Sequence, residues 1–163
     1  MRQIQHVGRL FRQAEHAIAQ EIHKHHEALG ITVSQGYLLM YLSRRVLAGD
    51  TPIYAKDVEQ DLGLRHSSIS GVLQRLEAKG FLFFETDDGD RRCKKIVLTE
   101  KAMEIRHKIE DNIRKTEEKI FRGMTPQEEA EFFRLLQKAT ENLTEGKAEP
   151  HPPFCTEQEE DAL

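Results

Sequence analysis

The sequence predicts a mainly α-helical fold with one small β-hairpin. Long stretches repeat apolar residues at intervals of three and four, the spacing of helices with one buried side. Near the middle of the chain, two short helical segments meet at Gly63, and two short apolar segments then flank the polar turn DDGDRR at 87–92. The order helix, turn, helix, strand, charged loop, strand indicates a winged helix-turn-helix, with further helices on either side.

Helix boundaries are predicted from capping residues and glycines. An amphipathic helix is expected from about residue 5 to residue 29, and Gly30 ends it. Thr32 and Gln35 fit a capping box at the start of a largely buried second helix. A loop follows at 46–52, and a third helix is expected from about residue 54 to residue 62.

The fourth helix, from His66 to Lys79, carries the predicted contact surface. Its apolar stripe must face the core, and it consists of Ile69, Val72, Leu73 and Leu76. The opposite side is small and polar, which suits close approach to a DNA groove, although serine-rich helix starts are also ordinary caps. The candidate DNA-binding residues on and beside this helix are Arg65, His66, Ser67, Ser68, Ser70, Gly71, Gln74 and Arg75.

The hairpin turn supplies a second set of candidate contacts. The candidate DNA-binding residues of this wing are Asp90, Arg91, Arg92 and Lys94. Arginine at an exposed hairpin tip suits the minor groove, where the potential is most negative. Asp90 lies two residues before Arg92, so both side chains share one face of the hairpin arm and the acid can orient the arginine. The alternative is a solvated tip with a surface ion pair of little energetic value.

Two more helices are expected after the wing. The first runs from about residue 100 to residue 121 with a narrow apolar seam, which favours packing against another helix. The second starts at the motif Thr125-Pro126 with Glu128 in its first turn, and it ends near Gly146. Residues 147–163 are acidic and contain prolines, so we expect disorder there.

The charge distribution permits DNA binding but does not predict it. The formal net charge is −4, yet six acidic residues and only one basic residue lie at 145–163, so the preceding 144 residues carry +1. DNA affinity depends on where the cations lie rather than on net charge. No apolar segment approaches the 18 residues of a membrane span, and the N-terminal segment lacks the apolar core of a secretory signal.

Side chains with catalytic, metal or redox chemistry give no firm site. No phosphate-binding loop, nucleophile elbow or HExxH motif is present, so we expect no enzyme activity, cofactor or metal. Cys93 and Cys155 have no CxxC spacing and are interpreted as free cytosolic thiols, with redox sensing at Cys93 as the alternative. His23 and His26 share a helix face, which leaves zinc sensing open, although a polar helix face is the simpler interpretation.

From about Val7 to Leu143, the chain resembles the MarR (multiple antibiotic resistance regulator) family. The resemblance lies in LRHSSISGVLQRLEAKGF at 64–81, followed by Asp90-Arg91-Arg92 and LTEKA at 98–102. It implies a cytoplasmic homodimer that binds a pseudo-palindromic double-stranded DNA operator, as a repressor that a small-molecule effector releases. The implied parts are an N-terminal dimerisation helix (1–31), a winged helix-turn-helix DNA-binding domain (32–99), C-terminal dimerisation helices (100–146) and the disordered tail (147–163).

The resemblance also implies that Arg92 enters the minor groove and that Asp90 orients it. Three positions depart from the family pattern. Gly89 lies where a base is sometimes found, Glu85 lies near a frequent arginine, and Arg65 occupies a capping position. These departures predict few phosphate contacts. The alternatives are a winged-helix protein–protein interaction module, or a regulator that responds to zinc, with His107 as a further ligand, or to oxidants.

Overall fold

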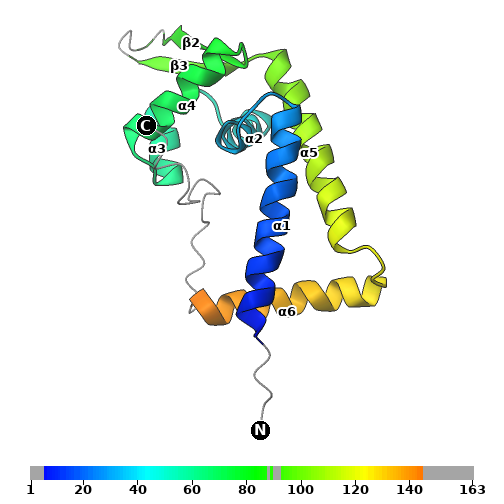
Figure 1. Ribbon diagram of the computed structural model, residues 1–163. Coiled ribbons are helices and arrows are strands. Elements are labelled where there is room, and N and C mark those ends of the chain that lie inside the picture. The colour runs from blue at the N-terminus through cyan, green and yellow to red at the C-terminus, as the bar shows by residue number, and fades with distance from the viewer. Residues whose placement is uncertain (1–5, 88, 90–92, 145–163) are drawn as a thin grey trace. The chain divides into compact units, whose positions relative to one another are not determined.

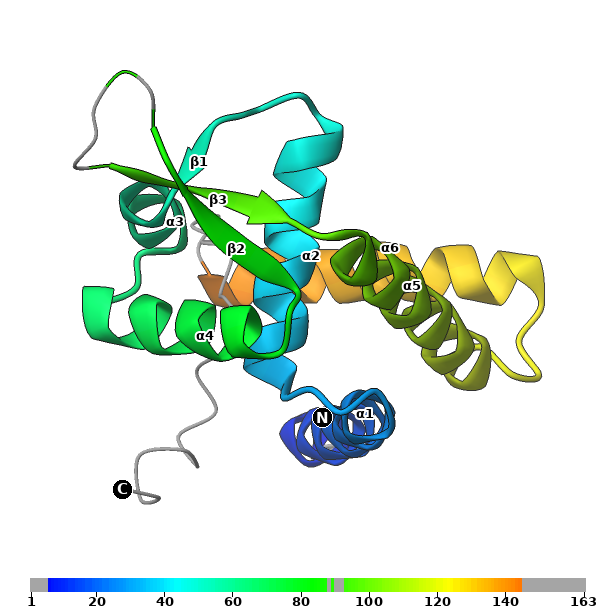
Figure 2. The ribbon, with the colours of Figure 1, turned by 90° about the horizontal axis from the view of Figure 1, so that it is seen from above.

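The computed structural model describes residues 6–87, 89 and 93–144, and the predicted mainly helical fold with a small sheet is confirmed. Two compact units divide the chain, at 1–113 and at 114–163. Figure 1 labels the helices and the strands β2 and β3, and Figure 2 also labels β1. The helices are α1 (Val7–Ala28), α2 (Val33–Leu47), α3 (Ala55–Leu62), α4 (His66–Ala78), α5 (Glu100–Ile120) and α6 (Pro126–Thr144), and the strands are β1 (Ile53–Tyr54), β2 (Leu82–Thr86) and β3 (Lys94–Leu98).

The helix starts follow their capping residues. At the start of α2, the Thr32 hydroxyl accepts the Gln35 amide hydrogen at 3.2 Å, and the Gln35 side chain accepts the Thr32 amide hydrogen at 3.2 Å. The predicted capping box is therefore confirmed. In the second unit, the Glu128 carboxylate accepts the amide hydrogen of Thr125 at 2.8 Å, and this bond lowers the pKa of Glu128.

The sheet has three strands where the sequence predicted two. Its order is β1-β3-β2, all antiparallel, and β1 places Ile53 opposite Ile96. The sequence interpretation put residue 53 before a helix and residue 54 inside it, and this was wrong. A strand of two residues is too short to show alternation, but Ile53 is buried, pairs with Ile96 of β3 and is of a residue type that favours strands.

The hairpin also extends further toward its turn than the apolar residues indicated. Strand β2 runs to Thr86, two residues beyond Phe84, the last residue of the apolar segment before the turn. Glu85 lies directly opposite Lys95 in the antiparallel register, and their side chains form an ion pair of 3.1 Å. Opposite charges at paired positions favour continued strand pairing, and hydropathy alone does not reveal this.

Helix α2 lies at the centre of the first unit. Leu38, Leu39 and Leu42 are fully buried on it, and α4 packs against it as well as against α3 and β2 (Figure 2). The stripe predicted for α4 is buried at Ile69, Leu73 and Leu76, while Val72 is only half-buried. Helix α4 is therefore fixed along one side, which leaves its polar side outward.

The turn between α3 and α4 depends on Gly63. Its φ of 62° lies in the left-handed region, where a residue with a Cβ is strained. The following Leu64 amide donates to the carbonyl of Glu59 at 3.2 Å, which closes the end of α3. This geometry brings the last turn of α3 beside the first turn of α4.

Two helices expose their apolar sides within their own units. Helix α1 has no buried residue. Its apolar residues Leu10 and Phe11 are 65% and 42% exposed. Helix α6 likewise has no buried residue, and Phe133 is 58% exposed. The rings of Phe132 and Phe133 nevertheless lie 5.9 Å and 5.3 Å from that of Phe121, centre to centre, inside the second unit.

Candidate nucleic-acid interface

Helix α4 presents the predicted contact residues on its outward side. Arg65, at the N-cap, has an extended backbone and makes no side-chain capping bond, so α4 begins without a side-chain cap. Arg75 donates from Nε to the carbonyl of Gly71 at 3.1 Å, which holds its side chain against its own helix. The exposed residues are Arg65, His66, Ser67, Ser68, Gln74 and Arg75, and the half-buried ones are Ser70 and Gly71.

A groove with a volume of about 480 Å³ brings part of this set together with the wing. His66, Ser70 and Gln74 of α4 line one side, and Lys94 of β3 lies across from them. Other predicted contacts of α4 do not line the groove, namely Arg65, Ser67, Ser68, Gly71 and Arg75. The predicted interface therefore consists of a groove beside the wing and a separate outward surface of α4.

Sequence reasoning missed several residues that line the groove. They lie on β1, at the start of α3, in the later turns of α4 and in or beside the strands of the wing. They are Tyr54, Ala55, Lys56, Leu73, Glu77, Phe84 and Cys93. Lys56 places its ammonium 5.6 Å from the centre of the Tyr54 ring. Because the strand β1 was not predicted, no sequence pattern placed these two residues beside α4.

Tyr54 also connects β1 to the beginning of the wing loop. Its hydroxyl donates a hydrogen bond to the Asp87 carboxylate, and this bond, aided by burial, raises the pKa of Tyr54 to about 12. The backbone amide of Asp87 donates to the Cys93 carbonyl at 3.0 Å, across the base of the loop. These two contacts connect β1 to the base of the wing loop, next to the groove.

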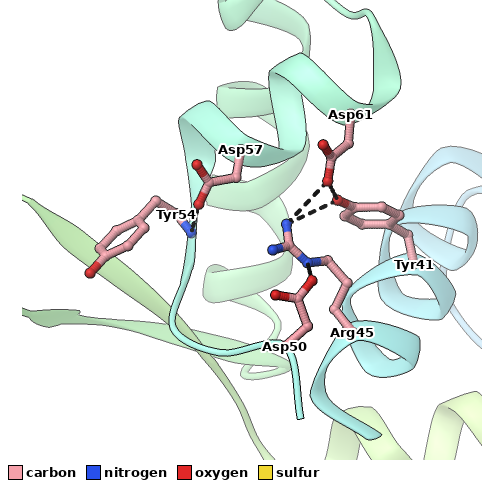
Figure 3. Close-up of polar contacts among 6 residues, drawn as sticks. All are labelled: Tyr41, Arg45, Asp50, Tyr54, Asp57 and Asp61. Carbon is pink, nitrogen blue, oxygen red and sulfur yellow. Dashed lines mark hydrogen bonds and ion pairs between the residues drawn. The ribbon is translucent and has the colours of Figure 1, made fainter. Parts of the chain in front are cut away.

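Arg45 forms a polar cluster that fixes α3 on α2 (Figure 3). Its Nε lies 2.6 Å from the Asp50 carboxylate, and its Nη1 lies 3.2 Å from both the Asp61 carboxylate and the Tyr41 hydroxyl. The Tyr41 hydroxyl donates to Asp61 at 2.5 Å. Burial, followed by this bond to Asp61, raises the pKa of Tyr41 to about 12.

The Arg45 cluster spans three segments that are separate in sequence. Asp50 lies in the loop before β1, and Asp61 lies in the last turn of α3. The hydrogen bond to Asp50 is the main reason that the pKa of Arg45 is raised, so the guanidinium stays charged. In the same region, Tyr54 donates its amide hydrogen to Asp57 at 3.2 Å, which secures the start of α3 (Figure 3).

A side-chain hydrogen bond crosses the turn between α3 and α4. His66 Nδ1 lies 2.6 Å from the Glu59 carboxylate. The His66 side chain is 77% exposed and the Glu59 side chain is 22% exposed. The carboxylate is therefore packed against the protein, while the imidazole is open to solvent. Glu59 did not figure among the predicted contacts, because its proximity to His66 depends on the left-handed turn at Gly63.

The remaining wing residues are only partly described. Asp90, Arg91 and Arg92 lie outside the described residues, so their predicted roles stay predictions. Lys94 is exposed at the start of β3. Gly89, where the family pattern sometimes has a base, donates its amide hydrogen to Asp87 at 2.7 Å.

The described residues give no metal cluster and no membrane span. Within 6–87, 89 and 93–144, no three His, Cys, Asp or Glu side chains gather as metal ligands. His26 instead bonds from Nδ1 to the Ile22 carbonyl at 2.8 Å, and burial lowers its pKa. None of the described helices is both long and apolar enough to span a bilayer.

Comparison with known proteins assigns both the segment and the fold. Residues 29–92 match the family model described as the MarR family. Among solved structures, a Clostridium acetobutylicum protein assigned to the MarR family of transcriptional regulators has a TM-score of 0.69 and 24% identity, over 83% of this chain and 97% of that one. MepR, a transcription regulator of the Staphylococcus aureus multidrug efflux pump MepA, has a TM-score of 0.71 and 23% identity, over 82% and 96%.

A third structure is a complex of Staphylococcus aureus MepR with DNA. It aligns with a TM-score of 0.61 and 23% identity, over 82% of this chain and 94% of that one. The matched segment, 29–92, runs from the end of α1 through the helix-turn-helix and into the wing loop. Residues 29–92 therefore match the MarR family model, and the chain has the winged-helix fold of these solved MarR-family structures.

Proposed function

We propose that the protein is a sequence-specific regulator of transcription that binds double-stranded DNA. One observation carries this proposal: α4 is fixed along its apolar side and turns its small polar side outward, next to the wing. A helix of this kind enters a major groove with the residues of its N-terminal half at the base edges. The MepR–DNA complex, which shares the fold, supports the same mode of binding.

The protein acts in the cytoplasm as a homodimer on a pseudo-palindromic operator. The support is the uncovered apolar side of α1, where Leu10 is 65% exposed, and that of α6, where Phe133 is 58% exposed. Apolar surface of this kind is stabilised when another chain covers it. Two recognition helices then occupy successive major grooves, which gives the operator its two-fold symmetry.

The regulator is a repressor that a small ligand or another effector releases. Support for release comes from the groove beside α4, because it is shared by His66, Ser70 and Gln74, the residues that DNA would contact. A molecule that occupies this space excludes DNA from the same side chains. The wing residues Asp90, Arg91 and Arg92 complete the interface, with Arg92 in the minor groove and Asp90 orienting it.

A mobility-shift assay with the promoter DNA of the protein's own gene tests this function. The wild type should shift that fragment in the presence of excess non-specific DNA. Ser70→Ala and Arg92→Ala should weaken binding while the protein keeps its oligomeric state. Arg44→Ala is the control for loss of one cation, because Arg44 is exposed on α2 away from the groove, and it should bind like the wild type.

Failure of the two interface variants to weaken binding would show that the contact residues are wrongly assigned. Absence of any sequence-specific shift would instead favour a winged-helix module for protein–protein interaction. The same assay repeated with zinc, an oxidant and a salicylate-like phenol identifies the class of effector. A salt titration measures the number of phosphate contacts, and a shallow slope is expected because Gly89 and Glu85 supply no cation to the wing.

A further inference from the structure

We infer that Glu59 and His66 act together as a specificity determinant, in which Glu59 sets the tautomer of His66 so that the imidazole accepts a hydrogen bond from a DNA base. This inference deepens the proposed DNA-binding function and depends on it. The geometry that carries it is a separation of 2.6 Å between His66 Nδ1 and the Glu59 carboxylate, across the turn that joins α3 to α4.

The tautomer follows from the chemistry of the pair. A carboxylate can only accept a hydrogen bond, so the bonded Nδ1 of a neutral imidazole must carry the proton. The other ring nitrogen, Nε2, is then left with its lone pair and acts as an acceptor. Without Glu59, nothing in the pair would favour this arrangement over the opposite one.

The position of the pair places the imidazole on the surface proposed to contact DNA. His66 is the first residue of α4, its side chain is 77% exposed, and it lines the groove between α4 and the wing. The N-terminal residues of a recognition helix are those that contact base edges. Glu59 is only 22% exposed, so it holds the ring from behind and is itself a positioning residue.

An acceptor selects among the base pairs. In the major groove, adenine N6 and cytosine N4 donate hydrogens, whereas guanine N7 and O6 and thymine O4 accept them. An Nε2 acceptor therefore favours adenine or cytosine at one operator position and is unpaired against guanine or thymine. A protonated or oppositely tautomerised His66 would donate instead, and it would favour guanine or a phosphate.

The first measurement is the tautomer of His66 in the free protein. Long-range proton–nitrogen correlation spectra at pH 8, assigned with His66→Gln, should show the proton on Nδ1 of the wild type. In Glu59→Ala, His66 should no longer favour the tautomer with its proton on Nδ1. In Glu59→Gln, His66 should keep that tautomer, because the side-chain carbonyl of glutamine can accept the hydrogen bond. His107 serves as the internal reference, because its Nδ1 lies 3.6 Å from Glu110, beyond hydrogen-bond distance. A wild-type His66 that carries its proton on Nε2 overturns the inference, whatever the protein does with DNA.

The second measurement is base preference, from selection on a randomised operator followed by affinity measurements. At one position the wild type should prefer adenine or cytosine by about tenfold, the scale of one specific base contact. Glu59→Ala should abolish that preference without weakening non-specific binding, because it removes a negative charge. Glu59→Gln should retain the preference, and His66→Arg should transfer it to guanine.

Two outcomes separate failure of the inference from failure of the proposed function. A wild type with an operator preference that is identical in Glu59→Ala at every position overturns the inference and leaves the function standing. A wild type without any sequence preference overturns both the proposed sequence-specific function and the proposed role of His66 in base recognition. In that case the spectroscopic result alone still establishes or refutes the tautomer.

Discussion

Arg45 connects α2 to the last turn of α3 and to the loop before β1. Its guanidinium contacts Asp50, Asp61 and Tyr41, and its side chain is only 16% exposed. The planar guanidinium donates from Nε and Nη1 in fixed directions to partners in different segments, a geometry that the compact ammonium of lysine does not reproduce. The cluster therefore requires arginine at this position, even though each of its acids is half-exposed.

Replacing Arg45 with alanine should lower the free energy of unfolding by about 1–3 kcal/mol. The variant loses three hydrogen bonds and leaves Asp61 and Tyr41 without their cation, and exposed partners limit the loss. Urea unfolding at one protein concentration measures it. Arg45→Lys should recover only part of the loss, and Arg44→Ala, an exposed arginine on the same helix, should change stability by less than about 0.5 kcal/mol. Equal effects at positions 44 and 45 would contradict the role of the cluster.

His26 gives stability a dependence on pH. Burial is the main reason that its pKa lies below the ordinary value of 6.5, so the folded protein resists protonation more than the unfolded chain does. Below pH 6.5 the unfolded chain therefore binds more protons, and the His26 contribution to stability is lost as the pH falls through its lowered folded pKa. At pH 7.5 both states are neutral and the contribution is intact.

Urea unfolding of the wild type and of His26→Gln at pH 7.5 and pH 5.5 checks this dependence. The free energy of unfolding of the wild type should fall more between the two values than that of the variant, which cannot take up the proton. The difference between the two changes is the His26 contribution, and other titrating groups cancel in the comparison. A larger fall in the variant would show that protonated His26 is better accommodated in the folded state.

At the scale of elements, α1 and α2 meet where a histidine ring covers a glycine. A Cβ built on Gly36 would lie 2.2 Å from His26 Nε2, so no side chain fits at Gly36 while the ring keeps its place. Gly36 is a helical residue with ordinary backbone geometry, and it is buried. It is therefore needed for close approach of α1 rather than for its backbone freedom.

Whether Gly36→Ala lowers or raises the free energy of unfolding should depend on the residue at position 26. With His26 present, the added methyl group collides with the ring, and the cost should be about 1–3 kcal/mol after displacement. In a His26→Ala background the collision is absent, so the better helix propensity of alanine should stabilise the protein by about 0.5–1 kcal/mol. A double-mutant cycle from urea unfolding measures the coupling. Equal effects of Gly36→Ala in both backgrounds would show that the ring moves away freely.

How well each element could be predicted depends on how local its cause is. The boundaries of α2 and α6 follow from Thr32 and Thr125, which bond to residues three positions along, and the helical segments were predicted within one or two residues. The strand β1 was missed because Ile53 is extended only through pairing with Ile96, more than 40 residues away. The part of the groove built on Tyr54 was missed for the same reason.

The candidate site shows the same limit. The polar side of α4 could be predicted because helical periodicity fixes which residues face away from the core, and the structure leaves most of them exposed. The pairing of Glu59 with His66 could not, because two residues seven positions apart meet only when the turn at Gly63 is left-handed. A turn glycine predicts a break between helices, but not which side chains meet across it.

For the whole molecule, the proposed dimer explains why two long helices leave most of their apolar residues exposed within their own units. Besides Leu10 and Phe133, the exposed apolar residues of α1 and α6 include Val7, Phe11, Phe132, Leu135 and Leu143. A monomeric protein rarely exposes this many large apolar residues on two helices, because exposed apolar patches usually mark an interface. One of these apolar sides lies on α1 in the first unit, and the other lies on α6 in the second unit.

Leu10→Glu and Phe133→Glu should each convert the dimer to monomer at concentrations where the wild type stays dimeric. A carboxylate buried in an apolar interface without a partner costs several kcal/mol, which raises the dissociation constant by at least about a hundredfold. Sedimentation velocity measures the mass, and circular dichroism should show unchanged helix content, since neither residue is buried within its own unit. The control is Leu47→Glu, a 59% exposed leucine at the end of α2, which should stay dimeric. Operator affinity should fall in the two monomeric variants, because each half-site then binds alone. Dimers that persist in both variants would place the interface elsewhere, and operator affinity that survives in a monomer would mean that a single winged helix-turn-helix is the binding unit.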